Sequence, residues 1–512
     1  MDLKSPCVCV AMLMFWSGGA KGESQSGTTY YVDSAGGNDR NAGTSPGRAW
    51  KSVEQVNRAT FGPGDHIFFK AGTVYAGHLQ PRGSGVAGHS IIIDQFGIGA
   101  KPRIDGEGLN RETLLLYNVE YWEVNNLEIT NTGQTREPFR AGVRVKLENF
   151  GTGHHIHLKN LFVRDVNGSN VKNLGGGTGI TCENSGARVK SRFDDLLIER
   201  CHLLRTDRDG VAIRSENNER GTNWHPSLRV VIRDNLLEDF GGDGIVPRGC
   251  EGALIEHNVL CGGRQRCDDY AAGIWPYSSD NTVIQFNEVS RMKGTKDGMA
   301  FDSDGNCRNT TIQYNYSHDN DGGFVMICGG RSNVGNIVRY NVSQNDAHRL
   351  IYITGPVRDI QFYNNICYLR KGLDAWAIWP GGGGPGEATA PSGYAEYVRF
   401  FNNIFYFEGR GEYHLGEMQA IFEANVFFGN QVNPPRDPRA LTSDPMLVAP
   451  GTGRDGLESA AGYQLKAGSP CIDSGVDAGW NGGRDFYGNV VPAGKVPNRG
   501  AFEFPATVSR SR

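Results

Sequence analysis

The feature that most constrains the fold is a short strand-like run, ending in asparagine, that recurs along most of the chain. Each run is rich in β-branched and aromatic residues, as in Val283–Asn287. From Asn235 to Asn364 the closing asparagines lie 23, 29, 28, 26 and 23 residues apart. Repeats of this length predict a solenoid with one coil per repeat. The closing asparagines are Asn126, Asn160, Asn235, Asn258, Asn287, Asn315, Asn341, Asn364, Asn402 and Asn425.

The runs are single strands without hairpin turns, which argues against a β-sandwich or a propeller. Asparagine tolerates a left-handed backbone, and its amide can bond to neighbouring peptide groups. Stacked at one corner of successive coils, these side chains would form a ladder. We therefore predict an all-β fold, a single right-handed parallel β-helix.

The two ends of the chain differ from the repeat. Residues 1–22 carry an apolar segment, Cys7–Trp16, followed by small residues, which predicts a signal peptide and secretion to the periplasm or medium. Residues 23–108 are interpreted as an N-terminal cap and the first strands, with a helix at Ser52–Ala59 that covers the open end of the core.

The β-helix itself is predicted to occupy residues 109–430. Residues 431–512, which begin with several prolines, are expected to form a C-terminal tail that packs on the helix. An insertion from Gly381 to about Glu396 interrupts one coil. It would either wall a groove or form a surface loop.

Composition excludes several classes of function. The net charge of −4 and the pI near 6.3 do not give the basic surface that nucleic acid requires. No run is long enough to span a membrane, no cofactor motif is present, and we expect a monomer.

Nine cysteines follow the signal segment, without a CxxC pair. Cys307 and Cys328 would form a disulfide between coils or remain buried thiols.

Several stretches carry a family resemblance. The asparagine repeat, the segments Asp297–Asp304 and Ser317–Gly323, the opening Tyr30-Tyr-Val and the tail Asn498–Glu503 resemble secreted bacterial β-helix repeat proteins of the pectate-lyase-like superfamily. The resemblance covers nearly the whole mature chain. It implies a carbohydrate-active protein, and it leaves the reaction open because the superfamily contains hydrolases, lyases and proteins without known activity.

An acidic turn followed by a short apolar strand recurs within the repeat and allows the coils to be aligned. Asp209–Arg214, Asp243–Arg248, Ala272–Tyr277, Asp297–Asp302 and Gly322–Ile327 form the alignment. Their third and fifth positions are apolar and should point into the core, so the fourth and sixth should point outward. The predicted outer face then carries Arg214, Arg248, Trp275, Tyr277 and Asp302, with Asp304 at its edge.

This face suits a polysaccharide, because aromatic rings pack on sugar rings and arginine bonds to hydroxyl and carboxylate groups. The predicted substrate-binding residues are Arg214, Arg248, Trp275, Tyr277, His318 and Asp243. A solvated face with a salt-bridge ladder would explain the arginines equally well, but it would not explain the aromatic residues.

Five aspartates between residues 297 and 321 are the candidate catalytic groups. Adjacent coils lie about 4.8 Å apart, and a retaining glycosidase needs two carboxyls about 5–5.5 Å apart. Crowding would raise the pKa of one carboxyl, which gives an acid and a nucleophile or base. A structural role in the turn is the alternative for the aspartates that precede glycine. The candidates are Asp297, Asp302, Asp304, Asp319 and Asp321.

Two other functions stay open. A polysaccharide lyase would abstract a proton with Arg214, Arg248, Tyr277, Lys293 or Lys296, while aspartates hold Ca²⁺. A third reading is a sugar-binding solenoid without turnover. Hydrolysis without a cofactor or metal is favoured, because carboxylates outnumber bases and no lysine occupies an aligned outward position.

Overall fold

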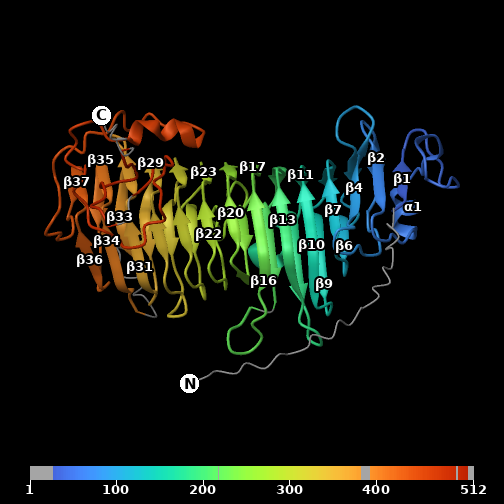
Figure 1. Ribbon diagram of the computed structural model, residues 1–512, viewed down its shortest axis with the longest axis horizontal. Coiled ribbons are helices and arrows are strands. Elements are labelled where there is room, and N and C mark those ends of the chain that lie inside the picture. The colour runs from blue at the N-terminus through green and yellow to red at the C-terminus, as the bar shows by residue number, and fades with distance from the viewer. Residues whose placement is uncertain (1–26, 217, 382–392, 492–493, 505–512) are drawn as a thin grey trace, which may run out of the picture.

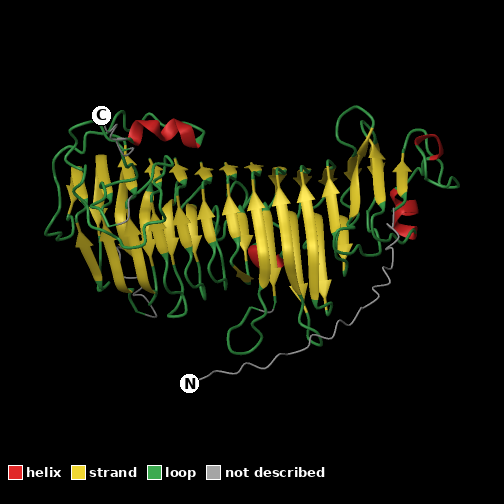
Figure 2. Cartoon of the chain, viewed as in Figure 1, coloured by secondary structure: helices red, strands yellow, loops and turns green. Residues whose placement is uncertain are grey.

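The computed structural model describes residues 27–216, 218–381, 393–491 and 494–504. The predicted signal peptide and most of the insertion after Gly381 lie outside these residues. The described chain is one elongated parallel β-helix, with the N-terminal coils at one end and the C-terminal coils at the other (Figure 1). Its regular secondary structure is almost entirely β-strand, joined by loops and turns, and helical segments are few and short (Figure 2). Among the described residues, no helix has the length and apolar character needed to cross a membrane.

The first sheet runs the whole length of the molecule and contains 15 strands. Each strand pairs in parallel with the strand of the next coil, as in Val283–Gln285 beside Thr311–Gln313. Its members are β1 (Thr29–Val32), β2 (His66–Lys70), β4 (Ile91–Phe96), β7 (Trp122–Asn125), β10 (Thr152–Lys159), β13 (Arg192–Glu199), β16 (Ser227–Arg233), β19 (Cys250–Glu251), β20 (Leu254–Glu256), β22 (Val283–Gln285), β25 (Thr311–Gln313), β28 (Ile337–Arg339), β31 (Arg358–Tyr363), β34 (Glu396–Phe401) and β36 (Ala420–Glu423).

The second sheet follows the first after a tight corner in each coil. Its members are β3 (Val74–Ala76), β5 (Arg103–Asp105), β8 (Glu128–Asn131), β11 (Phe162–Val166), β14 (His202–Thr206), β17 (Leu236–Glu238), β21 (Val259–Cys261), β23 (Glu288–Ser290), β26 (Tyr316–His318), β29 (Val342–Gln344), β32 (Ile366–Leu369), β35 (Ile404–Tyr413) and β37 (Val426–Val432).

The third sheet closes the coil and carries the predicted outer face. Its members are β6 (Glu112–Tyr117), β9 (Ala141–Glu148), β12 (Thr178–Ser185), β15 (Val211–Ser215), β18 (Ile245–Pro247), β24 (Met299–Ser303), β27 (Gly323–Ile327), β30 (His348–Ile353) and β33 (Asp374–Pro380). Between β18 and β24 the sheet continues through single bridges, Ile245 to Ile274 and Ile274 to Phe301. Aliphatic and aromatic side chains from all three sheets fill the interior.

The four helical segments lie outside the coils. Helix α1 (Val53–Arg58) forms where the sequence predicts it, with Ser52 as N-cap accepting a bond from the Gln55 amide. Val53 and Val56 face the first coils and are fully buried, so the helix covers that end of the core. The others are the 3₁₀ segments η1 (Pro46–Arg48), η2 (Lys172–Leu174) and η3 (Leu457–Tyr463).

The asparagine ladder forms, but four of the ten asparagines predicted for it, Asn126, Asn160, Asn364 and Asn402, lie outside it. The Asn287 amide donates to Asn315 Oδ1 at 3.0 Å and to the carbonyls of Ile255 and Gln285. The ladder then continues through Asn365 and Asn403, not through Asn364 and Asn402. Its members are Asn235, Asn258, Asn287, Asn315, Asn341, Asn365, Asn403 and Asn425. Asn126 and Asn160 bond to each other in a separate, exposed pair.

The backbone explains this correction. The residue before each ladder asparagine has a left-handed conformation, as at Phe286 (φ 54°) and Tyr314 (φ 57°). Asn364 and Asn402 occupy that preceding position, with φ of 53° and 57°. In the pairs Asn364-Asn365 and Asn402-Asn403, the first asparagine makes the corner and the second joins the ladder.

The C-terminal tail packs against the second sheet and the adjacent corner. The Asn364 amide donates to the carbonyls of Asn498 and Gly500, and the Asn402 amide donates to Val476. Segment η3 lies along the side of the C-terminal coils (Figure 2), where Tyr463 is fully buried. Asn364 and Asn402, which make corners and are absent from the ladder, therefore bond to the tail.

Replacing Asn287 with alanine is expected to lower the free energy of unfolding by about 3 kcal/mol or more. The side chain is fully buried, and its loss leaves several donors and acceptors of three coils without partners. Chemical denaturation measures the change. Gln285→Ala, two residues earlier on the outer side of β22, is the control and should change stability by less than about 1 kcal/mol. Equal effects of the two substitutions would contradict the ladder as a source of stability.

A second prediction concerns His318, which lies buried beneath the tail. Burial opposes its charged form, but bonds to Asp319 and Glu288 outweigh burial and raise its pKa to about 9. Glu288 in turn accepts the Gly456 amide of the tail. The ring should therefore stabilise the fold fully below its ordinary pKa of 6.5, and lose that contribution as pH rises through about 9.

Unfolding free energies measured from pH 6 to pH 10 test this dependence. The stability difference between the wild type and His318→Gln should shrink between about pH 6.5 and pH 9. A difference that stays constant over this range would show that the charge on His318 contributes nothing.

Candidate active site

Two adjoining cavities lie on the outer side of the third sheet, near the middle of the solenoid. Their volumes are about 310 and 280 Å³. Four residues line both of them: Lys172, Asp243, Trp275 and Asp304. The first cavity extends toward Arg214, Arg248 and Tyr277. The second extends toward Asp297, Asp302, Met326, Cys328 and Tyr352.

The register of the third sheet differs from the sequence alignment after Tyr277. Phe301, not Met299, pairs with Ile274, which is a shift of two residues that leaves Asp302 on the outer side. Val325, not Met326, pairs with Phe301, which is a shift of one residue that exchanges the two faces. Met326 therefore lines the cavity, whereas Ile327 is fully buried in the core.

The cause lies in the turns before the strands. Asp297 and Gly298 both have a left-handed backbone, with φ of 60° and 64°, and Asp297 pairs with Ala271. The acidic turns that look alike in sequence thus take up different numbers of residues.

Side chains that point outward from successive coils of the third sheet form two columns. One contains Val246, Trp275, Asp302, Met326 and Tyr352, and the other contains Arg214, Arg248, Tyr277, Asp304, Cys328 and Thr354.

Asp302 and Asp304 lie two residues apart on the same outward side and share one neighbour, Cys328. The Cys328 thiol donates to Asp304 Oδ1 at 3.0 Å and lies 3.8 Å from Asp302 Oδ1. Burial, with the nearby charges of Asp304 and Asp297, raises the pKa of Asp302 well above its usual range. Burial and the two carboxylates likewise raise the pKa of the Cys328 thiol well above 9. The Cys328 thiol is therefore protonated at neutral pH, and the surroundings of Asp302 favour its protonated form.

Asp297 faces the same cavity from the turn before β24. Burial is the main reason that its pKa is raised to about 6, and the charges of Asp243 and Asp304 add to this effect. Lys172 and Arg349 oppose the shift. A carboxyl group with a pKa near 6 can both donate and accept a proton at neutral pH, which suits a general acid.

Asp243 holds the aromatic wall of the cavity in place. Its Oδ1 accepts bonds from the Trp275 indole at 2.9 Å and from the Ala272 amide. Its Oδ2 lies 3.1 Å from Arg208 Nη2 and 3.4 Å from Lys172 Nζ. Lys172 also lies over the Trp275 ring, 4.6 Å from its centroid. Because its carboxylate bonds are directed at protein groups, Asp243 positions Trp275.

The two arginines of the predicted face have different surroundings. Arg214 pairs with the buried carboxylate of Asp209, so part of its charge is already neutralised. Arg248 is exposed and lies over the Tyr277 ring, 4.9 Å from the centroid. Together Arg248 and Tyr277 form an open polar and aromatic edge of the first cavity.

Three of the predicted site residues do not join the cavity. His318 is buried on β26 under the tail, and Asp319 bonds to it at an exposed corner of the second sheet. The Asp321 carboxylate accepts the amide of Gly294 in a loop. The third sheet thus brings together Asp243, Asp297, Asp302, Asp304, Arg214, Arg248, Trp275 and Tyr277, but not Asp319, Asp321 or His318.

Sequence reasoning missed three lining residues. Lys172 comes from η2, in a loop between coils where no repeat marks it. Tyr352 lies one coil beyond the aligned segments, and a longer alignment in the correct register would have found it. The sequence suggests for Cys328 only a disulfide with Cys307 or a buried thiol, not a place in the site. In the structure both thiols are free.

Comparisons with known proteins give a consistent result. Residues 178–367 match the family model of the right handed beta helix region. The predicted right-handed parallel β-helix is confirmed. A lacto-N-biosidase of Bifidobacterium longum subsp. longum is 28% identical over 580 aligned positions, which include 92% of this chain and 35% of the relative. The chain thus spans about a third of the length of that relative.

Solved structures show the same fold. The crystal structure of a GH136 lacto-N-biosidase from Eubacterium ramulus aligns with a TM-score of 0.61 and 27% identity, over 79% of this chain and 68% of that one. The structure of XylC in complex with xylose aligns with a TM-score of 0.50 over 93% of this chain and 98% of that one, at 11% identity, and shows similarity of fold only. The expected resemblance to carbohydrate-active β-helix enzymes is therefore confirmed.

The protonated state of Cys328 gives a third prediction. At pH 8 the thiol should react slowly with iodoacetamide, because the thiolate is the reactive form and two carboxylates disfavour it. Asp304→Asn should speed the reaction by removing a nearby negative charge. Asp321→Asn, outside the cavity, is the matched control and should leave the rate unchanged. Peptide mass mapping follows the modification of each cysteine. Rapid alkylation in the wild type would contradict the prediction.

Proposed function

We propose that the protein is a secreted glycoside hydrolase that cleaves a glycan in the cavity on the third sheet. The observation that carries this proposal is that Asp297, Asp302 and Asp304 line one cavity beside Trp275. One of them, Asp297, has its pKa raised to about 6. The similarity to lacto-N-biosidases over most of the chain supports hydrolysis.

In this proposal Asp297 is the general acid that protonates the glycosidic oxygen as the bond breaks. It is partly buried, its pKa is about 6, and it faces the cavity. The developing positive charge on the sugar then needs a carboxylate nearby.

Asp304 supplies that carboxylate, as the nucleophile or as the base that activates water. Of the two carboxyls beside Cys328, Asp302 is nearly inaccessible and its pKa is raised by burial, whereas Asp304 is partly exposed and lines both cavities. The Cys328 S–H bond fixes one oxygen of Asp304 and leaves the other for the reaction. Asp302 acts through its neighbours as a positioning residue.

Sugar rings would pack on the aromatic side chains of the outward columns, Trp275, Tyr277 and Tyr352. Arg248 and Lys172 add hydrogen-bond donors at the rim. The names of the relatives make oligosaccharides that contain lacto-N-biose the first substrates to test. Since the reaction rests on carboxyl groups, the proposal includes no cofactor.

The lyase alternative finds less support in the geometry. Lys293 and Lys296 are exposed outside the cavity, and the Lys296 ammonium bonds to the Asp268 carbonyl. Arg214 is paired with Asp209. Arg248 and Tyr277 remain near the cavity, so an assay for unsaturated uronate products is the direct check of this alternative.

Replacing Asp297 or Asp304 with asparagine should lower kcat/KM by about 10²- to 10⁴-fold, because each substitution removes a proton donor or a carboxylate. Asp321→Asn is the control, since this aspartate lies in a similar turn outside the cavity. Released sugar is measured with lacto-N-biose-containing oligosaccharides and a wider glycan panel, together with ultraviolet absorbance of unsaturated products. Loss of activity in Asp321→Asn alone would overturn the site. Ultraviolet-absorbing products would favour the lyase, and binding without turnover would favour a sugar-binding solenoid.

The pH profile gives a further prediction. The general acid must be protonated, so kcat/KM should fall as pH rises through about 6. Lys172 favours ionised Asp297, and Lys172→Met should therefore move this fall to higher pH. A profile of kcat/KM between pH 4 and pH 9 measures both effects. A shift to lower pH in Lys172→Met would contradict the role of Asp297.

A further inference from the structure

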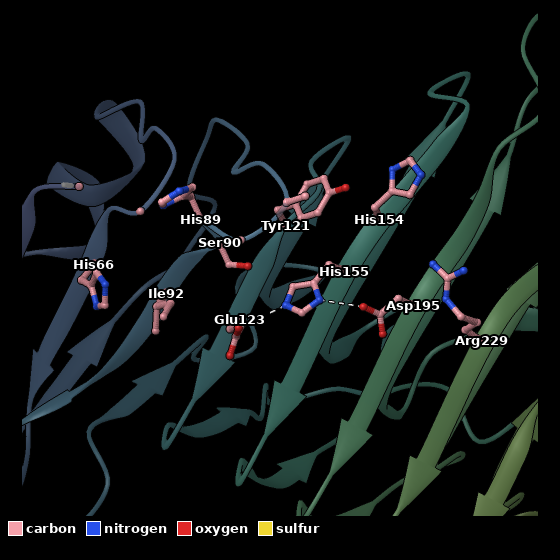
Figure 3. A pocket seen from close by; sticks show the side chains of 14 residues that line it. His66, His89, Ser90, Ile92, Tyr121, Glu123, His154, His155, Asp195 and Arg229 are labelled. Carbon is pink, nitrogen blue, oxygen red and sulfur yellow. Dashed lines mark hydrogen bonds and ion pairs between the residues drawn. The ribbon is translucent and has the colours of Figure 1, made fainter. Parts of the chain in front are cut away.

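A second hollow lies on the first sheet, toward the N-terminal end of the solenoid and on a different sheet from the candidate active site. It has a volume of about 580 Å³. Figure 3 shows that its floor carries imidazole and carboxyl groups from neighbouring strands, with His155 between Glu123 and Asp195. The proposed hydrolysis uses none of these residues.

A row of left-handed residues crosses the strands at this point. Tyr121, His155, Asp195 and Arg229 have φ of 57°, 51°, 74° and 48°. The ladder between β10 and β13 skips His155 and Asp195 without a change of register, so both strands kink at the same level. A left-handed residue other than glycine within a strand is uncommon, and such residues cluster at functional sites.

Two histidines of β10 lie close together at this kink. His155 and His157 are two residues apart, a separation of about 6.6 Å in a regular strand. Their ring centroids lie only 3.8 Å apart, with 40° between the ring planes. Glu123 stands directly beside His157 on the neighbouring strand β7. One ligating atom of each of Glu123, His155 and His157 lies within 4.8 Å of the others.

The surrounding bonds orient these groups. Asp195 lies 2.7 Å from His155 Nδ1 and 3.0 Å from His157 Nε2, so one carboxylate contacts both rings. The other nitrogen of His155, Nε2, lies 3.2 Å from Glu123 Oε1. The second oxygen of Glu123 accepts from Lys159 Nζ at 2.6 Å. If Asp195 accepts an N–H from each ring, the opposite nitrogen of each ring keeps a lone pair, and that of His155 lies 3.2 Å from Glu123 Oε1.

We propose that Glu123, His155 and His157 bind one divalent cation of the zinc class, with Asp195 as the carboxylate that orients both imidazoles. Two imidazoles and one carboxylate form a common ligand set for Zn²⁺, and histidine ligands favour Zn²⁺, Cu²⁺ or Ni²⁺ over Ca²⁺ and Mg²⁺. Ligating histidines usually donate their other N–H group to a carboxylate, which is the place of Asp195.

The cation would join adjacent coils. Glu123 belongs to β7, the histidines to β10, and Asp195 to β13, which are three consecutive strands of the first sheet. A ligand that binds only the folded chain stabilises it. Zn²⁺ should therefore raise the melting temperature without altering glycan hydrolysis, because the site lies on another sheet.

Isothermal titration of the untagged protein with ZnCl₂, after dialysis against EDTA and then metal-free buffer, tests the proposal. One Zn²⁺ per chain is expected, together with a rise in melting temperature, and CaCl₂ should give neither. His155→Gln and His157→Gln should each weaken Zn²⁺ binding by more than about tenfold. His154→Gln is the matched control, because His154 lines the same hollow but pairs with Glu120 outside the cluster.

Circular dichroism and metal-free melting curves of each variant show whether it is folded, and Glu123→Gln provides a second variant that leaves both rings in place. Absence of Zn²⁺ binding in the wild type would overturn the proposal. Binding that survives in His155→Gln and His157→Gln, or that is lost equally in His154→Gln, would also overturn it. Failure of the glycan assays would leave these outcomes unaffected.

Discussion

The structure depends on the parallel stacking of coils, and the asparagine ladder keeps that stacking in register. The ladder side chains bond to neighbouring coils, and several also bond to their own coil, as Asn287 does with Asn258, Asn315 and Gln285. A buried amide left unpaired in this position costs free energy, so a slipped coil is disfavoured. The second sheet starts from the corner whose position the ladder sets.

Regular stacking on the inside permits irregularity on the outside. Turns between the strands differ in length and conformation, as the left-handed Asp297 and Gly298 show, while the apolar core residues keep their spacing. Residues from successive coils consequently form columns on the outer surface. Trp275, Asp302, Met326 and Tyr352 come from four coils and meet along one side of a cavity. The same construction gathers Glu123, His155 and Asp195 on another sheet.

Burial sets the chemistry of the carboxyl groups in the cavity. Asp302, Asp297 and Asp304 have like charges and lie close together, and the wall over them excludes water from Asp302 most completely. The three carboxyls therefore differ: burial raises the pKa of Asp302 well above its usual range, the pKa of Asp297 is raised to about 6, and Asp304 is open to the cavity. Two further residues shape the cavity. Asp243 bonds to Trp275, and Lys172 opposes the rise in the pKa of Asp297.

The sequence by itself determined the solenoid, because the period of the asparagine-ended strands leaves few other ways to bury their apolar residues. It also identified Trp275, Tyr277 and the aspartates at 297, 302 and 304, since composition and strand alternation mark them. Tertiary structure alone decided the rest. Turn geometry sets the register of Met326, keeps Asp319 and Asp321 out of the cavity, and places Lys172 in it. A change of one residue in a turn alters this geometry, and the repeat in the sequence does not reveal it. The left-handed backbone at His155 was likewise decided by the tertiary structure, because no residue pattern in the sequence predicts it.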